Sequence, residues 1–241
     1  MSDVSQLLPT KLYAPVPHPD RVQRARLTAR LAAGVRHGHS LLLCSAPAGY
    51  GKTTLLTSWL YEDTLPFTWL SLDQRDNNMR TFGRYLVAAL QRLDAMLGSA
   101  RHNQLAAPTL AAPEALAQAF LGDLATLTQP VVLVLDDLQA VTAPEIYAFL
   151  AALLEHPAPQ LRLVLSTRVD PPFPLARLRA SGRLTEIRAA DLRFTHDEAH
   201  TFFQQTMHVA LSREDVHLLD SRTEGWVAGL QLAALSLQGL D

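Results

Sequence analysis

The sequence of 241 residues is short of the features that mark secreted, membrane-spanning and cysteine-based proteins. Its single cysteine, Cys44, excludes a disulfide framework and a zinc site of paired cysteines. No apolar run reaches the roughly 18 residues that a membrane-spanning helix requires. The N-terminus has no charged stretch followed by an apolar core, so we expect no secretory signal and a cytoplasmic location.

Lysine is almost missing as well, since it occurs at Lys11 and Lys52 alone and arginine supplies the other basic residues. The net charge of −2 predicts no strongly basic surface, so we do not expect this chain to bind DNA by itself. Hydrophobic residues make up 48% and charged residues 18%, which is typical of a globular protein. The length leaves room for one α/β domain and a small appendage.

One of the two lysines lies in a glycine-containing segment, residues 46–54, which reads Ala-Pro-Ala-Gly-Tyr-Gly-Lys-Thr-Thr. An apolar run over residues 40–45 precedes it, and an apolar helical pattern over residues 55–60 follows it. A strand, a glycine loop with Gly-Lys-Thr and a helix are the parts of a phosphate-binding P-loop, or Walker A motif. The strict motif begins with glycine where this chain has Ala46, a tolerated small residue. We predict that the nucleotide, ATP or ADP, contacts Pro47, Ala48, Gly49, Tyr50, Gly51, Lys52, Thr53 and Thr54.

Each part of this loop has a chemical use. Gly49 and Gly51 permit the backbone bend that turns several N–H groups toward a polyanion. The first turn of the following helix adds further N–H donors and the positive end of its dipole. Lys52 brings a compact charge to the β- and γ-phosphates, and the Thr53 hydroxyl is a ligand for Mg²⁺.

A second apolar run, residues 131–135, ends on the carboxylates Asp136 and Asp137. Its length and β-branched residues predict a strand buried on both faces of a parallel sheet. An apolar strand that ends in Asp-Asp also resembles the start of a capped helix. About eighty residues after a P-loop, however, the first acid is placed to hold Mg²⁺ beside Thr53 and the second to orient or deprotonate the attacking water. We therefore predict Asp136 as a metal ligand and Asp137 as a catalytic residue.

Two arginines are further candidates for the nucleotide site. Arg168 follows an apolar run over residues 161–167, and ligands of open α/β sheets bind beyond the carboxyl ends of the strands. We expect Arg168 to sense the γ-phosphate and to act with Lys52 in catalysis; the alternative is a salt bridge with Asp170 or with an acidic loop. Arg24 and Arg26 lie on a helix that we expect Asp20 to cap, and one of them approaches the base unless the arginines of this helix form only a solvated basic face.

The pattern of elements predicts an α/β fold: a three-layer P-loop NTPase with a parallel sheet, followed by a small helical lid. Residues 1–20 are rich in proline and are expected to form an extended N-terminal arm. Residues 21–190 would form the P-loop NTPase core, with a loop between helices over residues 98–113. Residues 191–241 carry three helical patterns, the first opened by a capping box at Thr195, and would form the lid.

The chain resembles the nucleotide-binding domain of the MalT-like, large ATP-binding regulators of the LuxR family. These proteins are signal-transducing STAND ATPases, a branch of the AAA-like P-loop proteins. The resemblance covers nearly the whole chain, and its most family-specific block is Thr-Glu-Gly-Trp-Val-Ala-Gly-Leu at 223–230. The other matching segments are residues 10–13, 24–27, 46–55, 135–137, 168–174 and 191–194.

This resemblance implies a sheet order of 5-1-4-3-2, with Asp136 as the Mg²⁺ acid and Arg168 as the sensor. It also implies a switch that is inactive with ADP and oligomeric with ATP and an inducer. In the related proteins the inducer and promoter DNA bind to C-terminal parts that this sequence does not contain, so we expect an N-terminal fragment of a longer regulator. The chain departs from the STAND pattern at Gln23, where the family has glycine, and at Arg26, where it has an acid.

Three hypotheses follow. The favoured one is an ATP- or ADP-binding signal-transduction switch of a transcription regulator, with slow hydrolysis controlling activation and self-association. The alternative is a P-loop kinase of small molecules or nucleotides, in which Arg177, Arg179 and Arg183 would form a lid. A binding protein with a dead site is the third, and the intact Lys52 and Asp136 argue against it.

Overall fold

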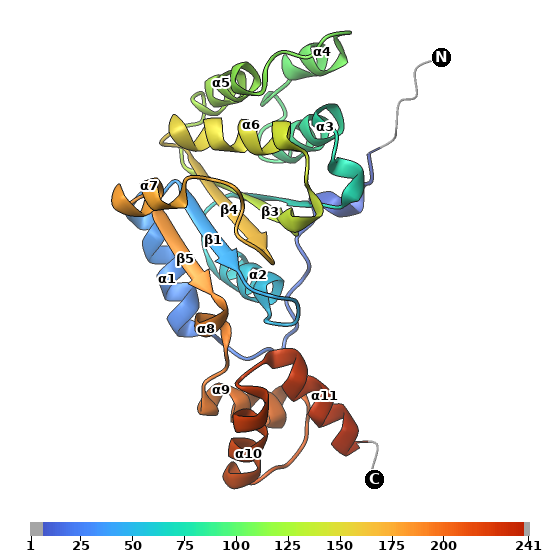
Figure 1. Ribbon diagram of the computed structural model, residues 1–241, viewed down its shortest axis with the longest axis vertical. Helices are drawn as coiled ribbons and strands as arrows, with labels where there is room; N and C mark the ends of the chain where they lie inside the picture. Colours follow the sequence, from blue (N-terminus) through green and yellow to red (C-terminus); the bar gives the residue numbers. More distant parts are fainter. Residues whose placement is uncertain (1–6, 239–241) are drawn as a thin grey trace.

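The computed structural model describes residues 7–238, and its centre is a five-stranded parallel sheet (Figure 1). The strands run in the order β2-β3-β4-β1-β5, which confirms the predicted order of 5-1-4-3-2. Their bounds are β1 Leu41–Ser45, β2 Phe67–Ser71, β3 Val131–Asp136, β4 Leu161–Thr167 and β5 Leu184–Arg188. Since all pairs are parallel, the carboxyl ends of β1, β3 and β4 lie at one edge of the sheet.

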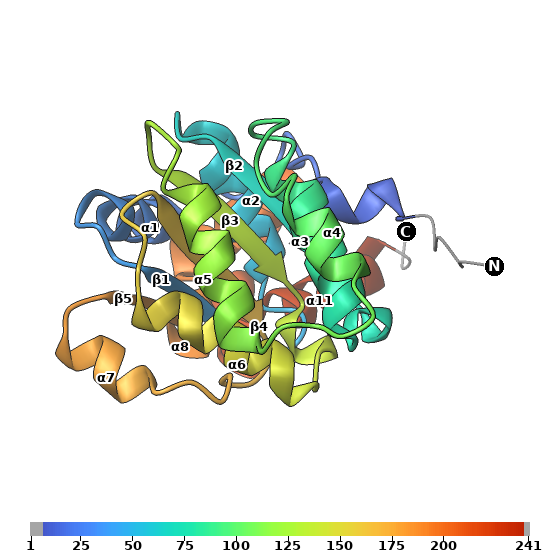
Figure 2. The same cartoon turned by 90° about the horizontal axis from the view of Figure 1, so that it is seen from above.

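Helices cover both faces of the sheet, which explains why every residue of β1, β3 and β4 is buried (Figure 2). On one face α1 Ala25–Arg36 and α2 Lys52–Glu62 pack against side chains such as Leu42 and Val134. On the other face the layer consists of α3 Met79–Leu90, α5 Pro113–Leu124, α6 Pro144–Glu155 and α7 Leu175–Ala180. The predicted three-layer fold is therefore confirmed.

Two local predictions were wrong. The first helix begins at Ala25 and not at Asp20, and its N-cap residue is Arg24, without a side-chain cap. The backbone of Arg24 is not helical, with φ −104° and ψ +54°, so residues 21–24 stay outside the helix. The segment between residues 98 and 113 is not all loop, since α4 Arg101–Ala106 packs on α3 through Leu105, which lies against Gly83.

The N-terminal arm is held to the sheet domain by its one lysine. Residues 1–6 of the predicted arm lie outside the described residues, and Pro9–Leu12 forms a short 3₁₀ turn instead of extended chain. Lys11 is buried and forms ion pairs with Asp76, itself fully buried, and with Asp73 at 3.3 Å. The Lys11 ammonium also lies 4.5 Å from the centre of the Tyr85 ring. A buried ammonium needs such partners, so the arm is anchored at this point.

The C-terminal helices form a small unit of their own beyond the carboxyl edge of the sheet (Figure 1). After α8 Ala189–Leu192 come α9 His196–Thr201 with a following π-helical turn Phe202–Thr206, α10 Arg213–Thr223 and α11 Val227–Gln238. The predicted capping box is present, with Thr195 Oγ1 accepting from Glu198 N at 3.2 Å. Residues 239–241 of the predicted lid lie outside the described residues. No helix within residues 7–238 is long and apolar enough to cross a bilayer.

Candidate nucleotide site

The P-loop connects β1 to α2 at the carboxyl edge of the sheet, as the motif predicts. Gly49 and Gly51 have φ angles of +79° and +78°, in the left-handed region that glycine adopts without strain. Gly51 is the N-cap of α2, so the helix begins at Lys52. The unpaired N–H groups of this first turn and the loop together form a concavity suited to an anion.

Lys52 is buried, and its ammonium donates to the carbonyl oxygens of Ala46 at 2.7 Å and Pro47 at 3.0 Å. Burial lowers the pKa of Lys52, and the positive charge of Arg168 lowers it further, whereas the carboxylates of Asp137 and Asp136 raise it. A polyphosphate would favour the charged form of Lys52, because an anionic oxygen is a stronger acceptor than a peptide carbonyl.

Asp136 ends β3, and its Oδ2 accepts a hydrogen bond from the Thr53 hydroxyl of α2 at 2.9 Å. The carboxyl group is buried, and burial raises the pKa of Asp136 because the charged form is disfavoured. A divalent cation at this point would favour the charged form of the carboxylate. A carboxylate beside a threonine hydroxyl also offers the oxygen ligands that Mg²⁺ prefers. The residues at this point therefore fit the predicted metal.

Asp137 has a backbone conformation that is rare outside glycine, with φ +58° and ψ +41°. Such strain is concentrated at functional positions. Its carboxylate accepts from Gln139 Nε2 at 2.7 Å, and Gln139 Oε1 in turn accepts from the backbone N–H of Arg168 at 3.1 Å. No sequence pattern pointed to Gln139, which connects the end of β3 to the end of β4.

Arg168 is exposed just beyond β4, at the same edge as the P-loop. The alternative role considered for it, a salt bridge with Asp170, is not formed. Asp170 instead pairs with Arg188 and accepts from the Ser45 hydroxyl at 2.9 Å. The role of Arg168 as a γ-phosphate sensor stays a prediction.

Arg24 is buried, so for this residue the interpretation as part of a solvated face is wrong. Its guanidinium donates to the carbonyl oxygens of Leu192 at 3.0 Å and Arg193 at 3.1 Å, and it forms an ion pair with Glu198 at 3.1 Å. It also lies 4.7 Å from the centre of the Phe194 ring. Arg24 therefore joins the sheet domain to the C-terminal helices.

A cavity of about 400 Å³ opens next to the P-loop, between the sheet domain and the C-terminal helices. Gly51 of the loop and Thr54 of α2 are among its lining residues, so the cavity adjoins the P-loop. The remaining lining comes from the segment before α1 (His18, Arg21, Val22, Arg24), from α2 (Leu55, Ser58) and from the C-terminal helices and the residues leading into them (Phe194, Phe202, Thr206, Met207, Val227, Gln231). This combination of apolar side chains with polar and charged ones suits a heterocyclic base, which has apolar faces and polar edges.

The C-terminal helices also touch the P-loop directly, which we did not foresee. Trp226 Nε1 donates to the carbonyl oxygen of Ala48 at 3.2 Å. The backbone N–H of Ala228 donates to the carbonyl oxygen of Gly49 at 3.1 Å. The block at 223–230, singled out by the family resemblance, was the available signal for this contact. The contact itself joins residues too far apart in the sequence for a local pattern to predict it.

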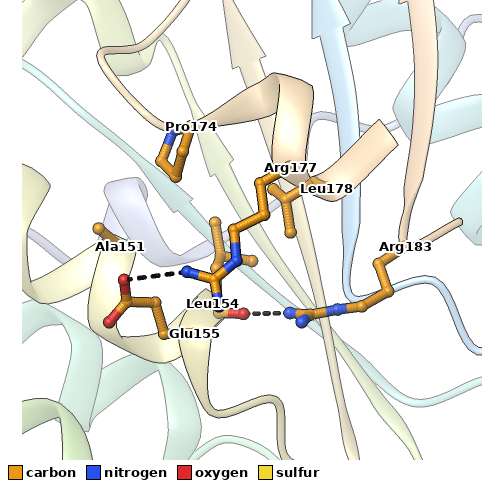
Figure 3. Close-up of a pocket in the computed structure, with 7 residues that line it drawn as sticks. All are labelled: Ala151, Leu154, Glu155, Pro174, Arg177, Leu178 and Arg183. Carbon is orange, nitrogen blue, oxygen red and sulfur yellow. Dashed lines mark hydrogen bonds and ion pairs between the residues drawn. The ribbon is translucent and has the colours of Figure 1, made fainter. Parts of the chain in front are cut away.

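The three arginines proposed as a kinase lid lie elsewhere, and Figure 3 shows two of them, Arg177 and Arg183. Arg177 is 3.9 Å from Glu155 and Arg183 donates to the carbonyl oxygen of Leu154, around a small hollow near the amino end of β5. Arg179 pairs with Glu186 at 2.6 Å. These contacts place them along β5 and α6, so the arginine lid that the kinase alternative requires is absent from the P-loop.

Comparison with known proteins agrees with this geometry. Residues 21–166 match the family model of the AAA ATPase domain. The HTH-type transcriptional regulator MalT of Serratia proteamaculans is 36% identical over 238 residues, and that of Klebsiella pneumoniae is 35% identical over 231 residues. Each alignment covers 95% of this chain and 25% of the relative, so the chain spans about a quarter of the length of these regulators.

Solved structures show the same fold at low identity. A Walker-type ATPase of Pyrococcus abyssi is 14% identical with a TM-score of 0.56, over 95% of this chain and 71% of that one. A RuvB variant of Thermotoga maritima is 14% identical with a TM-score of 0.51, over 92% and 65% of the two chains. The family model covers more than half of the sequence. The P-loop, the strand order and the acidic end of β3 agree with that family. The chain therefore belongs to the AAA ATPase domain family and resembles MalT regulators over this domain.

Proposed function

We propose that this domain is an ATP- and ADP-binding switch of a LuxR-type transcriptional regulator, acting in the cytoplasm. Slow hydrolysis of ATP would control its activation and self-association. In this proposal residues 21–190 form the nucleotide-binding core and residues 191–241 a lid. Inducer and DNA would bind to other parts of a longer protein, as the length of the MalT relatives suggests.

The observation that carries the proposal is the joint position of three features around one loop. The P-loop with Lys52 and the Thr53–Asp136 oxygen pair adjoin a cavity that Gly51 and Thr54 help to line, and residues of the C-terminal helices line another part of this cavity. A ligand that fills both the concavity and the cavity has a polyphosphate at one end and a base at the other. Its binding energy depends on where the C-terminal helices lie, which is what a switch requires.

Binding uses this chain's own groups in defined roles. The N–H groups of the P-loop and of the first turn of α2 bind the phosphates, and the Lys52 ammonium exchanges the carbonyls of Ala46 and Pro47 for phosphate oxygens. Thr53 and Asp136 would hold Mg²⁺, which when bound neutralises charge on the β- and γ-phosphates. Arg24 closes the cavity from the side of the base.

Hydrolysis would proceed from the edge of the sheet that carries Asp137. The oxygen of a water molecule bonds to the γ-phosphorus while the bond from that phosphorus to the bridging oxygen of the β-phosphate breaks, giving ADP and phosphate. Asp137 accepts the proton that the water loses, and Arg168 and Lys52 stabilise the charge on the transferring group. Since one oxygen of Asp137 is occupied by Gln139, we expect the other to face the water.

Turnover of ATP by the purified chain tests this proposal. We expect slow release of phosphate into water, well below the roughly 1 to 100 per second of kinases, and no phosphoryl transfer to nucleosides or sugars. Asp137→Asn should reduce turnover about a hundredfold while ATP affinity is kept. Rapid transfer to an acceptor, or ATP binding without any effect of Asp137→Asn on turnover, would contradict the hydrolytic switch.

A further inference from the structure

The first turn of α11 is attached to the P-loop by two hydrogen bonds. Trp226 Nε1–H donates to the Ala48 carbonyl at 3.2 Å and Ala228 N–H donates to the Gly49 carbonyl at 3.1 Å. Backbone N–H groups in the first turn of a helix have no acceptor within their own helix. α11 thus satisfies one of its free donors on the loop that the nucleotide would occupy.

Two glycines make room for the indole ring of Trp226. A Cβ atom at Gly49 would lie 2.9 Å from Trp226 Nε1 and 2.6 Å from Ala228 Cβ. A Cβ atom at Gly229, one helical turn after Trp226, would lie 2.8 Å from the ring at Cε3. Neither position accepts a side chain without displacing the ring, so the spacing Gly-Trp-x-x-Gly and Gly49 of the P-loop fit one another.

The two carbonyl groups that accept these hydrogen bonds belong to peptide groups whose N–H groups are available to bind phosphate. The Ala48 carbonyl shares its peptide with the N–H of Gly49, and the Gly49 carbonyl shares its peptide with the N–H of Tyr50. In a trans peptide the two groups point in opposite directions, and no peptide among the described residues is cis. Within residues 7–238 the N–H groups of Gly49 and Tyr50 donate to no backbone acceptor, so they are available to phosphate. A donor on each carbonyl fixes the peptide plane and makes the opposite N–H a stronger donor.

We infer that Trp226 is a positioning residue of the nucleotide site: together with Ala228 it holds two P-loop peptide groups so that their N–H groups face the phosphates. The inference rests on the proposed function, because it requires a polyphosphate at the P-loop. Coupling of this kind is reciprocal, so a polyphosphate strengthens the attachment of α11 by the same factor by which Trp226 strengthens binding. The phosphate end of the nucleotide thereby acts on the C-terminal helices, apart from any contact of the base.

Trp226→Phe tests the inference because it keeps a ring between the glycines and removes the N–H. We expect the calorimetric Kd for Mg·ATP to rise about three- to tenfold, with the thermal midpoint unchanged. The matched control is Trp69→Phe, which removes a comparable indole donor to Ser71 Oγ (2.9 Å) in β2 and should leave the Kd unchanged. Gly229→Ala is a second variant: it keeps Trp226 but pushes its ring, and it should weaken binding in the same direction.

Inorganic tripolyphosphate separates the phosphate end from the base. It reaches the P-loop without filling the cavity, so its affinity should fall in Trp226→Phe by the same factor as that of ATP. Loss of ATP affinity with unchanged tripolyphosphate affinity would overturn the inference and assign Trp226 to the base.

Tryptophan fluorescence tests the reverse direction of the coupling, which is the effect of a polyphosphate on the attachment of α11. Trp226 is 36% exposed, whereas Trp59 and Trp69 are 2% and 1% exposed, so iodide quenching of the wild-type chain reports Trp226. We expect tripolyphosphate to reduce this quenching. Unchanged quenching together with wild-type affinity of Trp226→Phe would overturn the inference. Failure of the wild-type chain to bind any nucleotide would instead contradict the proposed function, and the two results are distinct.

Discussion

The sheet domain and the C-terminal helices are stabilised in different ways. The sheet domain has a hydrophobic core on each face, and its three central strands are buried along their whole length. The C-terminal helices share a much smaller core, made of Ala199, Phe202, Phe203, Val216, Leu230 and Ala234. A large core maintains the loop geometry that phosphate binding needs, whereas a small unit can change its position at low cost.

Hydrogen bonds and an ion pair connect the two regions. Arg24 binds carbonyl oxygens at the end of α8, Thr206 Oγ1 donates to the Asp20 carbonyl at 2.6 Å, and Trp226 binds the P-loop. Such contacts exchange readily with water, unlike a shared hydrophobic core. The comparison teaches that the chemistry is built into the rigid part, while the response depends on a few hydrogen bonds that a ligand can strengthen or replace.

The largest predicted effects concern the two lysines of the sheet domain, one of which should act on ATP binding and the other on stability. Lys52→Ala should abolish measurable ATP binding in calorimetry and leave the fold intact, because the charge over the phosphates is lost. Lys11→Ala should do the opposite: it leaves the buried Asp76 carboxylate without its cation and should cost about 3 to 5 kcal/mol of unfolding free energy. Equal ATP affinity in both variants would remove the distinction between a site lysine and an anchoring lysine.

The next effect concerns the metal. Asp136→Asn should remove most of the increase in ATP affinity that Mg²⁺ produces, with a loss of tenfold or more, because an amide is a weaker ligand than a carboxylate. Affinity measured in the presence of a chelator should be unchanged or slightly higher. Mg²⁺ dependence equal to that of the wild-type chain would show that Asp136 does not hold the ion.

A smaller effect is expected at the joint. Arg24→Ala should weaken ATP binding about tenfold and increase hydrogen exchange in α9 and α10 while exchange in β1, β3 and β4 stays slow. Arg30→Ala is the matched control, since Arg30 lies in α1, close to Arg24 in the sequence, but pairs with Asp191 at 2.9 Å on the surface. A uniform increase in exchange across both regions would contradict the division between a rigid and a movable part.

The smallest predicted effect is a pH-dependent contribution to the stability of the sheet domain. The hydrogen bond from Arg179 holds the pKa of Glu186 down to about 2, with Arg188 as a second partner. Because the folded pKa is depressed, the stability from this group is present above pH 4.5 and is lost as the pH falls toward 2. Glu186→Gln should therefore cost about 1 to 2 kcal/mol at pH 7 and less at pH 3, as measured by urea unfolding at the two values. An equal loss of unfolding free energy at pH 7 and pH 3 would contradict the depressed pKa of Glu186.

The sequence predicted those parts that depend on local patterns. Buried strands, the glycine loop and the capping box at Thr195 are set by neighbouring residues, and the sheet order followed from the family resemblance. The pairing of Thr53 with Asp136 could be predicted because both lie at strand or helix ends that a parallel sheet brings to one edge.

The remaining features depend on contacts between distant segments. The start of α1 at Ala25 is explained by Arg24, whose partners Leu192 and Arg193 come near the end of the chain. The role of Lys11 depends on Asp76, and that of Trp226 on Ala48, 178 residues away in the sequence. No periodicity or capping pattern carries such information, so these side chains look like ordinary surface or core residues until the fold is known.

The central claim, that the P-loop and Lys52 bind the phosphates of a nucleotide, is tested most directly by denaturing the purified protein and identifying what it releases. We predict about one molecule of ADP or ATP per chain from the wild-type protein and none from Lys52→Ala. A wild-type preparation that releases no nucleotide, and that afterwards takes up no Mg·ATP, would contradict the account.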